Sequence, residues 1–194
     1  MRKAFFLFIA LILTLTACSN DDLERQEIVK GFSEASYLQM TAEICCEYEN
    51  EQRSYTLSCH YVPEGLSVVS VVEPEELLGL VAEFEGKEKR LSYQDTVLDA
   101  PLLGMNGISP ASLLPLLCDA IRDGYIIEES AEDCKDIPAW RITFLEEGEQ
   151  ESLYYTVWFA KEDGRPLAAE LTEGTVLNFK LAFTDFIFGD ILTK

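Results

Sequence analysis

Apolar and polar residues alternate along most of the chain, and this alternation predicts a fold built mainly from β-strands. Every second residue is apolar from Tyr37 to Tyr48 and again from Tyr55 to Tyr61, as expected for strands that bury one face. Glycine-containing turns separate the later stretches and are typical of hairpins. Further strands are predicted at residues 66–72, 77–84, 90–93, 96–98, 125–127, 140–144, 153–159, 167–171 and 177–183.

Two segments have helical spacing instead. Residues 21–36 place apolar side chains three and four apart, which predicts an amphipathic helix. Ser109-Pro110 then has the pattern of an N-cap followed by proline at the first helical position, and it opens a leucine-rich run that ends at Asp123-Gly124. This second helix is apolar around much of its circumference, so we expect a sheet to envelop it. Pro115 lies inside it and predicts a kink or a restart.

The chain begins with a pattern typical of secretion. Arg2 and Lys3 precede an unbroken apolar run over residues 4–13, which is too short to span a bilayer. The ending Leu15-Thr16-Ala17-Cys18 resembles the lipobox of bacterial lipoproteins. That resemblance implies that residues 1–17 are a cleaved signal and that Cys18 is diacylated on sulfur; the alternative is an ordinary signal peptide that happens to contain a cysteine. Residues 18–194 then form a single domain outside the cytoplasm.

The charge of that domain is strongly negative. The signal carries two of the 15 basic residues and none of the 35 acidic ones, which leaves 13 basic against 35 acidic residues and a net charge of −22. This balance argues against nucleic acid and against adsorption on anionic lipid, since both need clustered lysine and arginine. It indicates either a solvated acidic shell or a basic protein partner.

The remaining five cysteines bear on disulfides and metals. A turn at residues 51–54 would place Cys46 opposite Cys59 on the core face, and Cys45 opposite His60 on the outer face. Cys46–Cys59 is therefore the disulfide candidate, with two reduced, buried cysteines as the alternative. No C-x-x-C pattern occurs and His60 is the only histidine, so we expect no metal site.

Catalytic motifs are equally scarce. The sequence contains no G-x-S-x-G, no H-E-x-x-H and no phosphate-binding loop. A single histidine does not supply a convincing nucleophile–base pair. We therefore expect no catalytic residues, no cofactor and no enzymatic activity.

A set of apolar residues could instead line a cavity. The loop before the second helix is unusually apolar, and several aromatic residues fall on predicted inner faces. These residues either surround an apolar ligand or simply fill the core. The cavity-lining candidates are Leu102, Leu103, Met105, Trp140, Phe144, Tyr155, Phe159, Phe179 and Phe183.

The order of these elements, together with three short phrases, resembles the LolA/LolB-like family of lipoprotein carriers. The phrases are Pro74-Glu75-Glu76-Leu77-Leu78-Gly79, Arg90-Leu91-Ser92-Tyr93 and Ser109-Pro110. The resemblance implies an α+β fold in which an antiparallel incomplete β-barrel wraps a central apolar helix, with an N-terminal amphipathic helix beside it. Within this family, the germination lipoproteins of spore-forming bacteria look most similar.

Anchor and resemblance together predict a non-catalytic, lipid-anchored extracytoplasmic protein that binds an acyl chain or an apolar segment in its half-barrel. The alternative is a membrane-tethered regulatory partner of a cell-wall (spore cortex) amidase. Phe186, Ile187 and Phe188 near the chain end could form an edge strand that pairs with such a partner or with a second copy, so a homodimer is possible. An anchored protein cannot shuttle between membranes, which argues against a soluble carrier.

Overall fold

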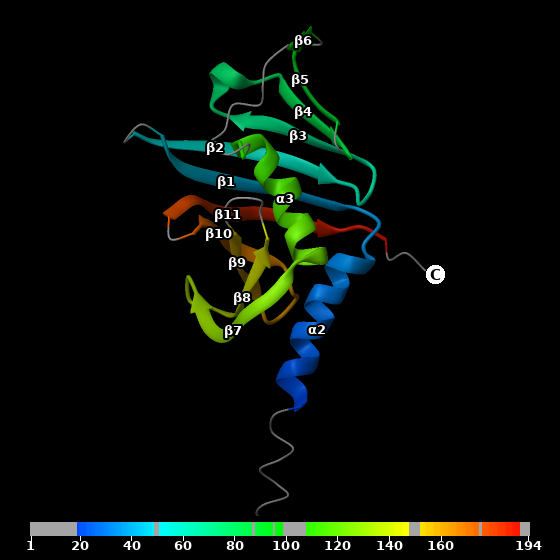
Figure 1. Cartoon of the computed structure of the whole chain (residues 1–194), viewed down its shortest axis with the longest axis vertical. Coiled ribbons are helices and arrows are strands. Elements are labelled where there is room, and N and C mark those ends of the chain that lie inside the picture. Colours follow the sequence, from blue (N-terminus) through cyan, green and yellow to red (C-terminus); the bar gives the residue numbers. More distant parts are fainter. Residues whose placement is uncertain are drawn as a thin grey trace, which may run out of the picture.

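The computed structural model describes residues 19–48, 51–86, 88–94, 96–98, 108–147, 152–174 and 176–190 (Figure 1). These residues form one sheet of eleven antiparallel strands, two α-helices and one 3-10 turn. In chain order the elements are α2 (Ser19–Glu34), β1 (Leu38–Tyr48), β2 (Glu51–Tyr61), β3 (Leu66–Glu73), η1 (Glu75–Leu77), β4 (Leu80–Glu85), β5 (Glu88–Tyr93), β6 (Thr96–Leu98), α3 (Pro110–Asp123), β7 (Tyr125–Cys134), β8 (Ile137–Glu146), β9 (Leu153–Ala160), β10 (Pro166–Glu173) and β11 (Val176–Phe188).

The strand order is β6-β5-β4-β3-β2-β1-β11-β10-β9-β8-β7. Pairing of β1 with β11 places the first and last strands side by side at the centre of the sheet. The middle of the chain therefore supplies both edges, β6 and β7, which are not paired with each other. The expected open antiparallel sheet with two helices is confirmed at this level.

Helix α3 joins the two edges, so the chain must cross one face of the sheet to connect β6 with β7. The helix contacts β2, β3 and β4 on one side and β8 on the other. Six strands lie between β4 and β8 in the sheet order, so a single helix can touch both only if the sheet curves around it. Figure 1 shows α3 lying across the concave side of the curved sheet.

The N-terminus of α3 follows the predicted pattern. Ser109 accepts a hydrogen bond from the backbone N–H of Ser112, and the Ser112 hydroxyl accepts one from the backbone N–H of Ser109, which completes a capping box after which Pro110 opens the helix. Of the kink or restart predicted at Pro115, the restart does not occur, because α3 continues through this residue without a break. Burial of eight α3 side chains against the sheet and α2 offsets the backbone hydrogen bond that proline cannot make.

The predicted register of the first hairpin is wrong. Strand β1 continues to Tyr48 and β2 begins at Glu51, so the turn is tighter than predicted and Cys46 lies opposite Arg53, while Cys59 lies opposite Met40. The two cysteines are therefore about 20 Å apart along the strands, far beyond the reach of a disulfide. The Cys46–Cys59 bridge is thus incorrect, and both are free thiols.

Two further expectations change with the topology. The strand predicted to begin at Leu77 begins at Leu80, after η1 and Gly79, whose φ of +90° favours glycine. Strand β11 lies between β1 and β10, so it is not an edge strand in the sheet order, and Phe186–Phe188 pair with β1. The ten-residue β7 and the short β6 are the edges instead, and the homodimer stays a prediction.

Candidate functional site: the inner face of the sheet

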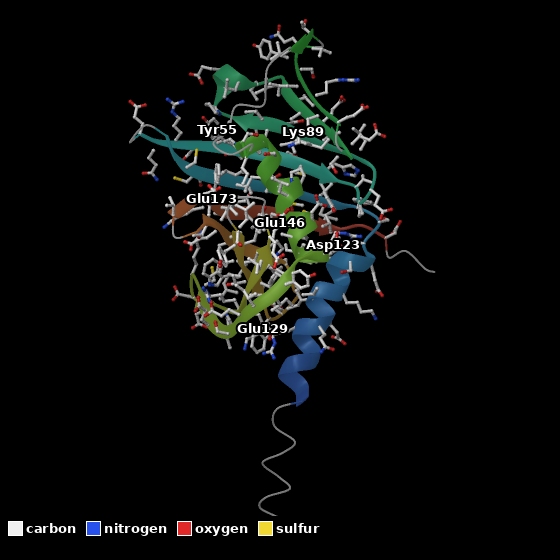
Figure 2. All side chains as sticks on the ribbon, in the orientation of Figure 1. Tyr55, Lys89, Asp123, Glu129, Glu146 and Glu173 are labelled. Atoms are coloured by element: carbon white, nitrogen blue, oxygen red, sulfur yellow. The ribbon has the colours of Figure 1, made fainter. Side chains whose placement is uncertain are left out.

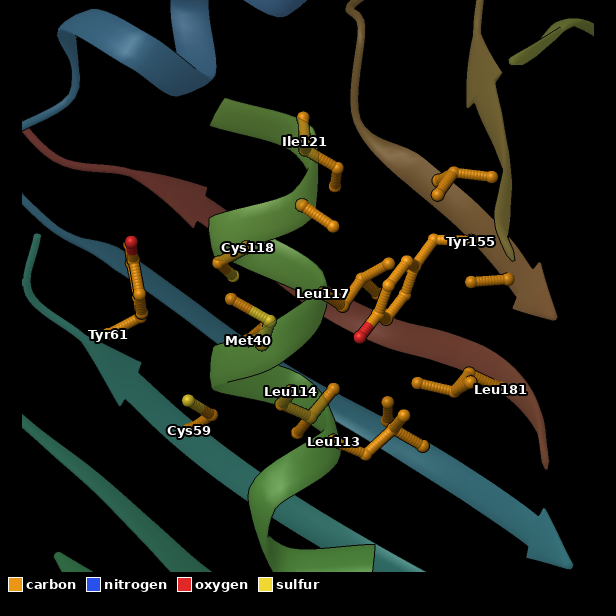
Figure 3. Close-up of a cluster of buried hydrophobic side chains, with 14 of the residues drawn as sticks. Met40, Cys59, Tyr61, Leu113, Leu114, Leu117, Cys118, Ile121, Tyr155 and Leu181 are labelled. Atoms are coloured by element: carbon orange, nitrogen blue, oxygen red, sulfur yellow. The ribbon is translucent and has the colours of Figure 1, made fainter. Parts of the chain in front are cut away.

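The inner face is the concave side that α3 covers. Helix residues Leu113, Leu114 and Leu117 are almost completely buried against the sheet, together with Cys118 and Ile121. The sheet presents to them the buried side chains shown in Figure 3, among them Met40, Cys59, Tyr61, Tyr155 and Leu181. Beneath α3, the inner face is therefore filled with protein side chains.

The half of the inner face around β8 and β9 is densely packed. Trp140, Phe144, Tyr155 and Phe159 are each exposed by 2% or less. The structure therefore places these four predicted cavity residues in the hydrophobic core. Phe179 and Phe183 are partly buried against the same core. Leu102, Leu103, Met105 and the lipidation candidate Cys18 lie outside the described residues.

Helix α2 docks beside this packed half through contacts in its middle and in its last turns. In its middle, the Arg25 guanidinium lies 4.8 Å from the ring centre of Trp140, and Arg25 Nε lies 2.7 Å from a carboxylate oxygen of Glu129 on β7. Figure 2 shows Glu129 on the part of β7 that runs beside α2. Near the end of α2, the Phe32 ring packs against Phe159 and Phe188 at centroid distances of 5.5 and 5.1 Å. The second half of α2 thus shares the sheet's apolar core.

The opposite half, around β4 to β6, is less covered. Cross-strand pairing aligns one continuous apolar row on the inner face, in the order Phe186, Met40, Cys59, Val69, Ala82, Leu91 and Leu98. Its members from Met40 to Ala82 are buried, Leu91 is half-buried, and Leu98 is 36% exposed. The apolar surface therefore continues beyond the part that the described residues cover.

Two polar contacts lie at the margin of the helix seat, the part of the inner face on which α3 packs. The Tyr61 hydroxyl donates to Asp119 Oδ1 on α3 at 2.5 Å, and Arg122 donates to the backbone oxygen of Phe32. Burial raises the pKa of Asp119, although the hydrogen bond from Tyr61 opposes that shift. Burial also raises the pKa of Tyr61, and its bond to Asp119 raises it further. These contacts tie α3 to β2 and to α2.

The thiols under α3 are poor nucleophiles. Burial raises the pKa of Cys59 to about 12 and raises that of Cys118 well above its ordinary value. A thiol attacks as a thiolate, so neither is activated. His60 is on the other side of β2, exposed and against the Tyr37 ring at 5.1 Å. Among the described residues, no group of three potential ligands is placed to hold a metal ion.

Sequence reasoning missed the Tyr61–Asp119 contact and the exposure gradient along β4 to β6. An acidic residue within the apolar α3 was the available signal for the first. The second had no local signal, because Leu91 and Leu98 have the same alternating pattern as buried positions.

Comparison with known proteins adds a fold likeness but no functional assignment. No protein-family model and no curated protein sequence matches the chain. None of the described helices combines the length and apolar composition needed to cross a membrane.

Several solved structures are similar at low identity. A domain named for outer membrane lipoprotein sorting, from Vibrio parahaemolyticus, has 13% identity and a TM-score of 0.48 over 88% of this chain and 93% of that one. A LolA superfamily protein from Nitrosomonas europaea has 13% identity and a TM-score of 0.40 over 87% and 97%. The Mycobacterium tuberculosis lipoprotein LppX has 11% identity and a TM-score of 0.44 over 87% and 96%.

One of these solved structures is named as a LolA superfamily protein, which is the family that the sequence resembles. Because every one of the three TM-scores is below 0.5, the likeness does not assign a function. The relation to germination lipoproteins stays a prediction.

Proposed function

We propose that this chain is a non-catalytic, lipid-anchored extracytoplasmic protein that binds an acyl chain or another apolar segment on the inner face of its sheet. The binding region is the β4–β6 half, where Phe84, Leu91 and Leu98 are only partly covered. The packed half around β8 and β9 serves as the scaffold. The anchor is Cys18, which directly precedes α2 and leaves a short tether.

The observation that supports this proposal most is the exposure gradient along the inner row. The exposed fraction rises from 2% at Ala82 to 36% at Leu98 while the chemistry of the side chains stays apolar. An acyl chain laid on such a row removes apolar surface from water at about 25 cal/mol for each Å² buried. Nothing in this site requires a catalytic group, and the nearby thiols are protonated.

A matched pair of variants tests the site. Leu98 lies on the inner row, whereas its neighbour Val97 is 62% exposed and pairs with Ser92 on the opposite face. Leu98→Asp should weaken binding of an uncharged fluorescent acyl ester by about tenfold, or about 1.4 kcal/mol, because a carboxylate beside the chain loses its hydration. Val97→Asp should leave binding unchanged.

The measurement is a fluorescence titration of the full lipidated chain with this acyl ester in neutral detergent. The ester is kept below the concentration at which it saturates the detergent micelles. Native mass spectrometry of protein purified from its own host is the second measurement, and it should show a bound apolar molecule. An absence of both probe uptake and a co-purified ligand contradicts the proposal. Equal loss in both variants shows that the inner row is not the site.

The second candidate is a membrane-tethered regulator that contacts a cell-wall (spore cortex) amidase. It is favoured by the edge strand β7, whose residues Tyr125, Ile126 and Ile127 are 70%, 42% and 51% exposed. Exposed edges pair readily with a strand of another protein. Tyr125→Lys with Ile127→Lys should abolish recovery of a specific cell-wall hydrolase from host envelopes. Unchanged recovery with this variant excludes β7 as the contact.

A further inference from the structure

The outer, convex face of the sheet contains a groove that the inner-face function does not use. Cross-strand pairing aligns a second row there, running across six strands in the order Trp158, Ala168, Ala182, Glu43, Thr56 and Glu73. At about 4.8 Å between neighbouring strands, the row is about 24 Å long. Ala168 and Ala182, the second and third residues of this row, keep the surface low beside Trp158.

Two hollows lie along this row and meet at Glu43. The first, of about 390 Å³, is lined by Trp158, Ala168, Ala182 and Glu43, with Cys45 and the β7–β8 turn beside them. The second, of about 570 Å³, is lined by Glu43, Glu73 and Glu75, together with Tyr55, Val72, Pro74 and Leu78. Because Glu43 lines both hollows, they lie next to each other along this row, and we call the pair the convex-face groove.

The two ends of the groove differ in charge. Glu43, Glu73 and Glu75 line the β1–β3 end, and no lysine or arginine is among the described residues that line it. The Thr56 hydroxyl donates a hydrogen bond to Glu73 at 3.1 Å. Because the hydroxyl is neutral, this contact does not neutralise the charge of the Glu73 carboxylate. At the β9–β11 end, Lys180 lies 3.7 Å from Glu170 and Lys135 adds a second positive charge. The surplus negative charge is therefore concentrated at the β1–β3 end.

We propose that this groove docks an extended basic peptide segment of a partner protein. Lysine or arginine side chains of the segment lie at Glu43, Glu73 and Glu75, and small apolar residues lie over Ala168 and Ala182 against Trp158. A groove of about 24 Å accommodates about seven extended residues. The proposal extends the function beyond ligand binding on the inner face and locates the basic partner that the net charge of −20 admits.

The probe is a fluorescein-labelled seven-residue peptide with two lysines at one end and leucine, alanine and glycine in the rest. Its binding to the full lipidated chain in neutral detergent is followed by fluorescence anisotropy at two salt concentrations. Binding should weaken as salt rises, since exposed charges are screened. A peptide in which glutamates replace the lysines should not bind.

Charge-matched variants locate the site. Glu43→Gln with Glu75→Gln should weaken binding by about three- to tenfold, as expected for two exposed charge contacts. The control is Glu85→Gln with Glu88→Gln, which removes the same charge from a directly paired site on the β4–β5 hairpin outside the groove. The control should bind as the unaltered chain does.

A third variant tests the apolar end without changing charge. Ala182→Phe fills the low, apolar part of the first hollow and should reduce binding by about tenfold, while its circular dichroism spectrum and melting temperature report whether the fold is retained. Bound peptide should also slow alkylation of Cys45, which lines the first hollow.

Three results overturn the proposal. Equal binding of the acidic peptide shows that charge complementarity is absent. Equal loss in the groove and control variants shows a general charge effect rather than a site. A chain that sediments as a dimer dissociated by Glu43→Gln with Glu75→Gln shows that a second copy occupies the groove. Leu98→Asp leaves peptide binding intact, so failure here is distinguishable from failure of the inner-face proposal.

Discussion

Around β8 and β9, the inner face buries Trp140, Phe144 and Tyr155 to 2% exposure or less, whereas around β5 and β6 Leu91 is half-buried and Leu98 is 36% exposed. Both halves belong to one sheet, and both present apolar side chains at alternate positions. The difference lies in what covers them. Helix α3 contacts β8, β2, β3 and β4, and α2 adds Phe32 to the core.

Under the proposed function, the apolar side chains of the two halves therefore have two different roles. In the covered half, each apolar side chain contributes to folding, because burial in the native state removes it from water. In the open half, part of that contribution is available to a ligand. An apolar inner face is therefore both scaffold and candidate site, and the exposure of each residue shows which use prevails.

The largest effect is expected in the alkylation rates of Cys59 and Cys118, the two thiols buried where α3 packs on the sheet. These rates show whether a ligand enters by displacing the helix. The raised pKa of Cys59, about 12 against an ordinary 9.0, lowers its thiolate fraction on the order of a thousandfold. Alkylation of the buried Cys59 at pH 8 should therefore be far slower than that of the partly exposed Cys45, as followed by mass spectrometry of the digest. The ratio should persist when acyl ester is bound in the β4–β6 half.

Rapid alkylation of Cys59 and Cys118 upon ligand addition would contradict the distinction between a packed half and an open half of the inner face. It would mean that α3 leaves its seat and that the packed half is also part of the binding surface. The control is Cys134, which lies away from the helix and should react at the same rate with and without ligand.

The same substitution in the two halves should differ in its effect on stability. Leu171 on β10 is 1% exposed, and Leu171→Ala should lower the free energy of unfolding by about 2–5 kcal/mol. Leu98→Ala should change it by about 0.5 kcal/mol or less, as at surface sites. Urea unfolding followed by circular dichroism measures both, and equal losses would show that Leu98 is as buried as Leu171.

Tryptophan quenching by a brominated acyl ester should give a smaller but direct signal. The chain contains only Trp140 and Trp158, of which the first lies in the packed half and the second on the outer face. Neither should be quenched. A tryptophan introduced as Phe84→Trp on the open half should lose fluorescence, because a bromine atom quenches a ring that it contacts and Phe84 is only partly buried. Quenching of Trp140 instead would place the ligand in the packed half.

Sequence reasoning predicted much of the architecture, because alternation and turn residues are local signals. Both helices and the alternating strands occur near the predicted positions, and the inner-facing aromatic residues are on the inner face. The first hairpin shows the limit. Residues 47–54 are mostly polar on both faces, so alternation does not specify where the chain turns, and the register shifted by six positions.

The position of a strand within the sheet was equally beyond local signals. Phe186 and Phe188 look like an exposed hydrophobic end, but pairing of β11 with β1 and packing against Phe32 cover them. The partial exposure of Leu98 depends on what packs over β6 in the tertiary fold, and the alternation along the strand does not encode it.

The smallest effect concerns pH and the contact that ties α3 to β2. Burial raises the pKa of Asp119, so the native protein takes up a proton at a higher pH than the unfolded chain does. Stability therefore increases slightly as pH falls through the pKa of the native carboxyl, and the gain levels off below that of the unfolded chain. Asp119→Asn keeps an acceptor for Tyr61 but cannot titrate. The variant should thus be more stable than the unaltered chain at pH 8, and the difference should shrink towards pH 4 when melting temperatures are compared. A variant that is less stable than the unaltered chain at pH 8, with a deficit that shrinks as pH falls, would show that the charged carboxylate stabilises the helix seat, and that polar contacts as well as apolar burial hold α3 over the inner face.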